Sequence, residues 1–265
     1  MTTDPNGSRS VPWIAVGLLA VLVGVIGAGF RTLPPPEREI VAYATGLTGR
    51  TPAQRHNAEL AAHALDGAVI APGATLSFNH AVKSWSLDQG YVKAPVSYDG
   101  ELVPAYGGGV CQTSTTLYNA GLLAGLVVVE RHHHVFAPHY VPPGRDAAVA
   151  YPSIDLRLRN AYAVPLRVRA TTRGGLLEVS LWGNLPSRPE TAIVSQVIST
   201  TVPQRVVRSL DVHAGAFHRN AGSVGYHVVT YRVIRSAGTE PSHRERLSDD
   251  TYPAMDHVVT VAALR

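Results

Sequence analysis

The clearest candidate for covalent chemistry is a glycine-rich segment that contains the chain's single cysteine. Residues 107–112 read Gly-Gly-Gly-Val-Cys-Gln. The three glycines allow backbone paths closed to other residues and leave bare N–H groups near Cys111. A helix is predicted over 112–124, so the thiol stands at a helix N-terminus, where the macrodipole favours the thiolate. The segment predicts a nucleophile with nearby oxyanion donors; a small buried thiol at a helix start is the alternative.

A run of three histidines, His132, His133 and His134, follows along the chain. Residues 126–135 are rich in β-branched side chains and predict a strand. Side chains alternate along a strand, so His132 and His134 are expected on one face and His133 on the other. The first pair can act as base and orienting partner, or can join Cys111 as zinc ligands. Solvated histidines at a strand end are the alternative without function.

Acidic residues after the histidines could complete a catalytic set. Asp146 and Asp155 are both candidates to orient a histidine. The order cysteine, histidine, acid supplies nucleophile, base and orienter, as in transglutaminase-like enzymes. In the segment Tyr140-Val141-Pro142-Pro143-Gly144-Arg145-Asp146, Arg145 could bind a substrate carboxylate through two hydrogen bonds. The alternative is that Arg145 and Asp146 only fix the turn.

Two helices are predicted to frame the cysteine segment. The first covers 52–66, with Thr51 as its N-cap, Pro52 in its first turn and Gly67 at its end. The second is the helix over 112–124. The expected core-facing residues are Leu60, Ala61, Ala64 and Leu65 on the first helix and Thr113, Leu117, Ala120 and Ala124 on the second.

Short strands make up most of the remaining chain. They are predicted over 126–135, 147–151, 155–160, 164–171 and 175–182, and then over 193–198, 224–234 and 257–263. Arg173-Gly174-Gly175 predicts a hairpin. Pro186 and Pro189 mark the start of a C-terminal β extension. The predicted class is α+β, with a few helices and a mostly antiparallel sheet.

The N-terminal part predicts a membrane anchor. Residues 11–30 contain no charged side chain, and a helix of this length can cross a bilayer core of about 30 Å. A cleaved signal peptide is the alternative, although Phe30 disrupts the usual small-residue cleavage site. Because a large body follows the span, we expect a single-pass protein of the cell membrane whose C-terminal domain lies outside the cytoplasm.

Charge and segment lengths complete the predicted organisation. The formal net charge of +4 comes from scattered side chains, which argues against a nucleic-acid partner. The segments expected are a tail (1–10), the anchor (11–30), a linker (31–50), a domain (51–185) and the β-rich extension (186–265).

Several motifs, in chain order, resemble the VanW family. They run from about Arg55 to Gly183 and include 77–79 (Ser-Phe-Asn), 90–91 (Gly-Tyr), 94–96 (Ala-Pro-Val), 107–112, 114–120 (Ser-Thr-Thr-Leu-Tyr-Asn-Ala), 130–132 (Glu-Arg-His), His134 and 140–146. The glycine–cysteine block and the Arg-His-x-His block are the most specific. His133 and Val135 stand where the family pattern has Asn and Ser.

The resemblance implies work on peptidoglycan. Some VanW-domain proteins are L,D-transpeptidases that form 3-3 cross-links, with the family cysteine, here Cys111, as nucleophile. It therefore implies a cysteine acyltransferase that acts on peptidoglycan stem peptides without a cofactor, with His132, ranked slightly ahead, or His134 as base and Asp146 as orienter. The substrate-binding residues would be Gly108, Gly109, Gln112, Tyr118, Tyr140 and Arg145. A non-catalytic wall-binding module and a zinc-dependent hydrolase that uses Cys111, His132 and His134 are the alternatives.

Overall fold

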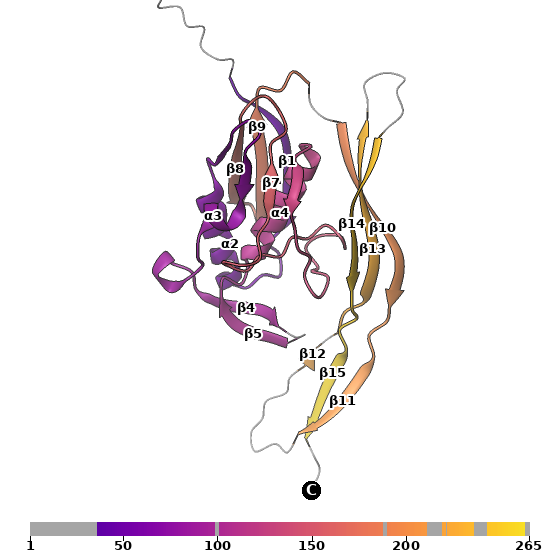
Figure 1. Cartoon of the computed structure of the whole chain (residues 1–265). Coiled ribbons are helices and arrows are strands. Elements are labelled where there is room, and N and C mark those ends of the chain that lie inside the picture. Colours follow the sequence, from indigo (N-terminus) through magenta and orange to yellow (C-terminus); the bar gives the residue numbers. More distant parts are fainter. Residues whose placement is uncertain are drawn as a thin grey trace, which may run out of the picture. The chain divides into compact units, whose positions relative to one another are not determined.

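The computed structural model shows a mixed α+β protein with few helices and mostly antiparallel sheets, as predicted (Figure 1). It describes residues 36–98, 101–187, 190–210, 219–220, 222–235 and 243–262. The predicted membrane span over 11–30 lies outside these residues. Among the helices that are described, none has the length and apolar character to cross a membrane.

A four-stranded antiparallel sheet forms the base of the first part of the chain. Its order is β1 (Arg38–Gly46), β9 (Leu176–Gly183), β8 (Leu166–Arg173) and β2 (Val69–Ile70). The hairpin between β8 and β9 turns at Gly174 and Gly175, both with positive φ, which confirms the predicted turn. β1 falls in the segment predicted as a linker, and that prediction was wrong. The strand forms through its pairing with β9, a partner far away in sequence, and Ile40, at a bulge in this pairing, is buried.

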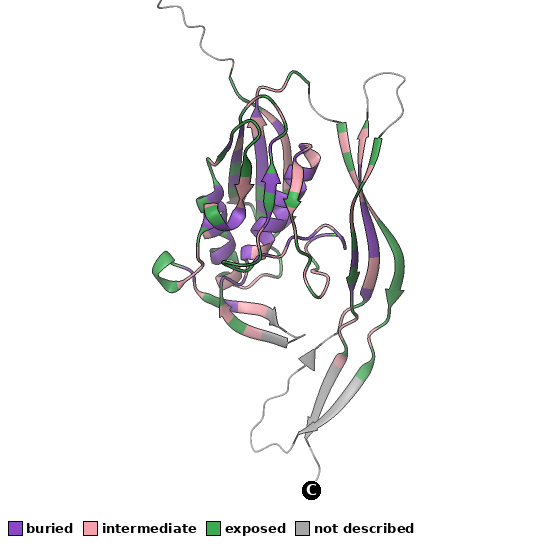
Figure 2. Ribbon diagram, in the orientation of Figure 1, coloured by how far each residue is buried: buried purple, intermediate pink, exposed green. Residues whose placement is uncertain are grey.

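Two helices pack together on this sheet. α2 (Pro52–Leu65) contacts β8, and α4 (Val110–Leu123) contacts β1, β9 and α2. The predicted cap of α2 is confirmed, because the side chains of Thr51 and Gln54 each accept from the other's backbone N–H, at 3.1–3.2 Å. α2 buries Asn57, Ala58, Ala61, Ala62 and Leu65, so the expected burial of Ala64 was wrong. Figure 2 shows that α4 is buried along most of its length.

Smaller elements surround the helices. They are β3 (Thr75–Ser77), α3 (Phe78–Val82), the 3-10 turn η1 (Leu87–Gln89), β4 (Lys93–Tyr98), β5 (Glu101–Tyr106), β6 (Val127–Glu130) and β7 (Arg157–Arg159). β6 ends at Glu130, well short of the strand predicted over 126–135. The segment 147–151 contains only isolated bridges rather than the predicted strand.

The C-terminal region is built of strands. β10 (Glu190–Thr201), β13 (Gly225–Arg235) and β14 (His243–Tyr252) form an antiparallel sheet with β13 in the centre. Beyond them, β15 (His257–Ala262) pairs with β11 (Arg205–Leu210) and β12 (Arg219–Asn220). β10 is largely exposed (Figure 2), whereas Arg232 of β13 is buried and donates to the carbonyl of Leu126 at 2.7 Å.

Candidate active site

The glycine segment is clamped between α2 and β4. The buried amide of Asn57 donates to the carbonyls of Gly108 and Val92, both at 2.9 Å. Gly109 is the N-cap of α4, with φ of 112°. A side chain at Gly109 would strike the backbone carbonyl of Gln54. Close backbone contact and a left-handed conformation both require glycine here, and together they fix where α4 begins.

Cys111 is the second residue of α4 and is partly buried. In its protonated form the thiol donates to the carbonyl of Val149 at 3.4 Å. The amides on either side of Cys111 donate to the carbonyls of Gly107 and Gly109, at 2.9 and 3.1 Å. Within the described ranges, no backbone carbonyl accepts from the amide of Cys111 itself. That N–H remains available to an oxyanion formed next to the thiol.

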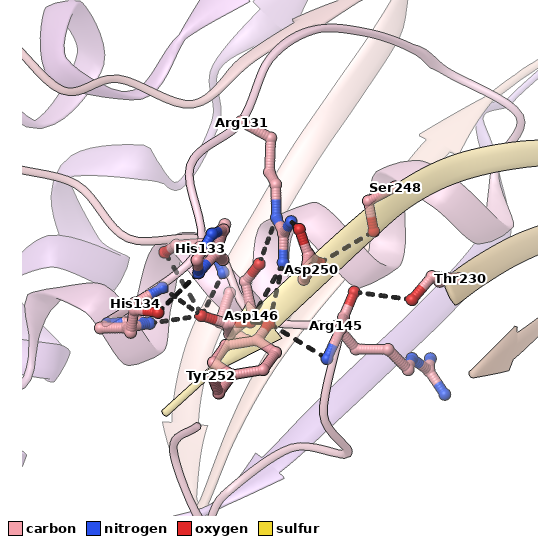
Figure 3. Close-up of polar contacts among 12 residues, drawn as sticks. Arg131, His133, His134, Arg145, Asp146, Thr230, Ser248, Asp250 and Tyr252 are labelled. Atoms are coloured by element: carbon pink, nitrogen blue, oxygen red, sulfur yellow. Dashed lines mark hydrogen bonds and ion pairs between the residues drawn. The ribbon is translucent and has the colours of Figure 1, made fainter. Parts of the chain in front are cut away.

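His134 and Asp146 stand beside the thiol. Both Nδ1 and the backbone N–H of His134 lie within hydrogen-bond distance of Asp146 Oδ2, at 2.6 and 2.7 Å (Figure 3). Because Nδ1 is taken by Asp146, Nε2 is the ring nitrogen left for the hydrogen bond with Cys111. Thiol, imidazole and carboxylate form the chain of contacts that activates a nucleophile.

The electrostatics of these three groups favour an ion pair. Burial acts against the charged form of His134, but hydrogen bonds to Asp146 and Cys111 raise its pKa to about 10. Burial raises the pKa of the Cys111 thiol, but the hydrogen bond and charge of His134 outweigh this and lower it. Burial also opposes the charge of Asp146, yet His134 and Arg131 bring its pKa down to about 2. These directions favour a thiolate–imidazolium pair.

A second layer of contacts holds the far side of Asp146. Its Oδ1 accepts from the hydroxyl of Tyr252 at 2.5 Å and from Arg131 Nη2 at 3.1 Å. Arg131 Nη1 donates to both carboxylate oxygens of Asp250, at 2.7 and 2.8 Å. The side chains of Arg131, Asp146 and Asp250 are at most 6% exposed. Asp146 is therefore fixed from the C-terminal strand β14 as well as from His134.

The comparisons with known proteins assign this part of the chain to a family. Residues 53–182 match the family described as VanW like protein. This segment of the chain belongs to the VanW family. It is similar to the uncharacterized protein YoaR of Bacillus subtilis (strain 168), at 39% identity over 147 residues, which are 56% of this chain and 48% of the relative.

A second relative carries a more specific name. It is the vancomycin B-type resistance protein VanW of Enterococcus faecalis (strain ATCC 700802 / V583), 35% identical over 109 residues, which are 39% of this chain and 40% of the relative. The chain thus spans half or less of the length of these two relatives. No solved structure matches the chain.

The VanW match contains only part of the arrangement. Cys111, His134 and Asp146 lie within residues 53–182, whereas Asp250 and Tyr252 lie beyond them. The groups able to carry out chemistry thus come from the VanW segment. The contacts that hold Asp146 from behind come partly from the C-terminal sheet.

The two other histidines point elsewhere. His132 is exposed, with Nε2 at 3.1 Å from a carboxylate oxygen of Glu130, and His133 packs its ring against Tyr252. The prediction that His132 and His134 share a strand face was wrong, because β6 ends at Glu130. Beyond that point the backbone N–H of His134 bonds to the Asp146 side chain rather than to a neighbouring strand.

The structure does not assemble the zinc ligands considered from the sequence. His132 lies with Glu130 rather than with Cys111 and His134. Across the described part of the chain, no group of three or more His, Cys, Asp or Glu side chains is placed to hold a metal ion.

Asp155, the other candidate orienter, has a structural position. Its carboxylate accepts from the Ser77 hydroxyl at 2.5 Å and from the backbone N–H of Asn79 at 2.8 Å. These bonds fix the start of α3, and they place Asp155 in a different set of contacts from His134.

Three of the residues expected to bind substrate instead use their side chains in contacts with other residues of the fold. The buried side chain of Gln112 donates to Thr45 Oγ1 and to the Gly46 carbonyl, at 3.0 and 2.8 Å. Tyr118 is buried beneath the guanidinium of Arg131, and burial raises its pKa to about 12.

Arg145 is the third of these residues. Its Nε donates to Asn119 Oδ1 at 2.8 Å, and its guanidinium stacks on Tyr43. Burial lowers the pKa of Arg145. Together with the matching bond from Asn119 to the Arg145 carbonyl, these contacts anchor the turn before Asp146.

Tyr140 remains next to the nucleophile. Its hydroxyl lies 3.4 Å from the carbonyl of Cys111, and the guanidinium of Arg50 stacks on its ring at 4.6 Å. Arg50 also donates to Gln112 Oε1 at 2.9 Å. Arg50 was not among the residues singled out from the sequence, since nothing local marks the residue before a helix cap as part of a site. Its cation has only neutral partners in these two contacts.

Proposed function

We propose that the chain is a cysteine acyltransferase of the L,D-transpeptidase type that acts on peptidoglycan stem peptides. The observation that supports this is the hydrogen-bonded arrangement of Cys111, His134 and Asp146, with Nδ1 of His134 at 2.6 Å from Asp146. The reaction class follows from the arrangement, since an activated thiol with a proton-carrying imidazole is suited to acyl transfer. The substrate class comes from the resemblance to the VanW family.

In the first step, the Cys111 thiolate attacks the carbonyl carbon of the third residue of a stem tetrapeptide. The carbonyl oxygen becomes an oxyanion, to which the Cys111 N–H can donate because no backbone carbonyl of the described residues accepts from it. As the tetrahedral intermediate collapses, the C–N bond to the terminal D-alanine breaks. His134 gives its Nε2 proton to the leaving amine, and a thioester on Cys111 remains.

In the second step, the amine of a neighbouring stem attacks the thioester carbonyl. Neutral His134 takes the proton lost by that amine, and the C–S bond breaks to regenerate the thiolate beside an imidazolium. Asp146 keeps Nδ1 protonated throughout and stabilises the imidazolium in both steps. No bound group beyond the two substrates enters this sequence.

Arg50 and Tyr140 would face the leaving side of the substrate. The guanidinium of Arg50 is next to the Cys111 turn, and in its two contacts with described residues it meets the Tyr140 ring and the amide oxygen of Gln112. The carboxylate of the terminal D-alanine is a group that such a cation binds well. This assigns to Arg50 the role that the sequence suggested for Arg145.

We further propose that residues 11–30 anchor the chain in the cell membrane and that the domain after them lies outside the cytoplasm, where peptidoglycan is. The uncharged apolar composition of that segment supports the anchor. A reporter fused after Arg265 tests the orientation, with activity expected only outside the cytoplasm. Activity in the cytoplasm would contradict it.

Intact-mass analysis tests the acyltransferase proposal. After incubation with a synthetic stem tetrapeptide, the protein should gain the mass of the tripeptide acyl group, and the Cys111→Ala variant should not. Since Cys111 is the single cysteine of the chain, a thioester adduct has one possible site. Binding of the tetrapeptide without an adduct would replace the proposal with a non-catalytic wall-binding role.

A further inference from the structure

Strand β14 makes an unusual contact with the candidate site. Its Asp250 binds Arg131 through both carboxylate oxygens, at 2.7 and 2.8 Å, and Arg131 in turn touches Asp146 Oδ1 at 3.1 Å (Figure 3). Ser248 donates to Asp250 at 2.9 Å and holds that carboxylate in place. One buried arginine is therefore shared by two buried carboxylates, of which only Asp146 contacts His134.

The sharing of Arg131 decides how much negative charge Asp146 offers to His134. An arginine paired with Asp146 alone would cancel the charge that stabilises the imidazolium. Because Nη1 is committed to Asp250, only Nη2 reaches the Asp146 carboxylate, and it does so at the longer distance. Arg131, Asp146 and Asp250 together carry one net negative charge, which matches one imidazolium.

We propose that Asp250 is a positioning residue for the active site: it neutralises Arg131, so that Asp146 keeps its charge for His134 and, through His134, for the Cys111 thiolate. This inference rests on the proposed function of the Cys111 site. It gives the C-terminal sheet, which lies beyond the VanW match, a part in the chemistry without direct contact with substrate.

The groups that set the charge of this site come from several elements. Those facing Cys111, His134 and Asp146, directly or through one neighbour, are Arg50, Tyr118, Arg131, His133, Tyr140, Asp250 and Tyr252. Of these, Arg50 and Arg131 are cations and Asp250 is the one carboxylate. Without the Asp250 charge, the Arg131 cation would be neutralised by Asp146 alone. The His134 pKa should therefore fall and the Cys111 pKa should rise.

Alkylation of Cys111 by iodoacetamide as a function of pH measures this directly, because the chain has no other thiol. The full-length protein in detergent is compared with Asp250→Asn and with Asp249→Asn, a control on the same strand whose carboxylate contacts His227 and Arg246. The pH at which the alkylation rate is half-maximal (the midpoint) should rise by about one unit in Asp250→Asn. It should not move in Asp249→Asn.

The double variant Arg131→Gln/Asp250→Asn removes one charge of each sign. Its midpoint should return toward that of the unaltered protein, and it remains informative if the single variant, with its unpaired buried arginine, does not fold. An unchanged midpoint in folded Asp250→Asn overturns the inference, as does a double variant displaced by a unit or more. A midpoint of the unaltered protein at or above the free-thiol value of about 8.5 would instead count against the proposed function.

Discussion

The VanW segment and the C-terminal sheet contribute different kinds of residue to one site. The VanW segment provides the Cys111 thiol, the His134 imidazole and the Asp146 carboxylate, and the imidazole contacts the other two groups. The C-terminal sheet provides Asp250, which binds Arg131, and Tyr252, which donates to Asp146. One region holds the groups that we propose to react, and the other holds part of the surroundings of a single carboxylate.

The difference shows how a site can depend on residues that its family match does not include. Asp146 is completely buried, and a buried carboxylate must have each oxygen satisfied. His134 satisfies Oδ2, while Oδ1 depends on Arg131 and on Tyr252 from β14. The VanW segment therefore leaves one oxygen of its central acid to be satisfied partly by the other region.

The largest effect is expected from the imidazole in the VanW segment. His134→Ala should slow acyl-enzyme formation by roughly 10²–10⁴-fold, since it removes the proton carrier and the partner of the thiolate. His132→Ala is the matched control, because His132 is exposed and paired with Glu130. Its rate of acyl-enzyme formation should stay within a few-fold of that of the unaltered protein. The rate of the mass increase on Cys111 measures both. Equal losses in the two variants would show that the assignment of the base is mistaken.

The next effect tests whether the two regions are joined energetically. Asp250→Ala leaves buried Arg131 without its main partner and should lower the free energy of unfolding by about 3–5 kcal/mol. Asp249→Ala removes an exposed carboxylate from the neighbouring position and should cost no more than about 1 kcal/mol. Urea unfolding of the full chain measures both variants. Similar small losses would mean that the C-terminal sheet is only loosely attached to the VanW segment.

The parts of the fold that could be predicted from the sequence are those with local causes. Thr51 and Pro52 mark the start of α2 through capping and a fixed φ. Gly174 and Gly175 mark the hairpin between β8 and β9 through their positive φ. β1 and β14 were missed. β1 pairs with a strand more than a hundred residues away, and β14 has a charged sequence that becomes a strand only through its pairing with β13.

The site divides in the same way. The position of Cys111 at a helix start follows from the adjacent glycines, and the contact of Asp146 with a histidine was expected from the order of residue types. The choice between His132 and His134 could not be made from the sequence. It depends on the end of β6 at Glu130 and on the Asp146 carboxylate, from a separate turn, which accepts from the backbone N–H of His134. Asp250 lies 119 residues after Arg131, and no local signal connects them.

A smaller effect should separate the two arginines considered for substrate binding. Arg50→Ala removes a cation beside the Cys111 turn and should raise the KM for stem peptides by about 10- to 100-fold, which corresponds to the loss of a charged hydrogen bond of roughly 1.5–3 kcal/mol. Arg145→Ala should instead lower stability with little change in KM, because its guanidinium is used by Asn119 and Tyr43. Steady-state kinetics with thermal melting distinguishes the two roles, and a rise in KM confined to Arg145→Ala would reverse them.

The smallest effect concerns one hydrogen bond between the regions. The buried hydroxyl of Thr230 on β13 donates to the carbonyl of Gly144, in the turn that leads to Asp146, at 3.1 Å. Thr230→Val keeps the shape and loses the donor, so it should lower the free energy of unfolding by about 1 kcal/mol. Thr191 on β10 is the matched control, because its buried hydroxyl has no partner among the described residues, and Thr191→Val should be neutral or slightly stabilising. Denaturant titration of both variants measures the difference. Equal losses would mean that the Thr230 bond does not hold the turn, and that the two regions meet chiefly through Arg131, Asp250 and Tyr252.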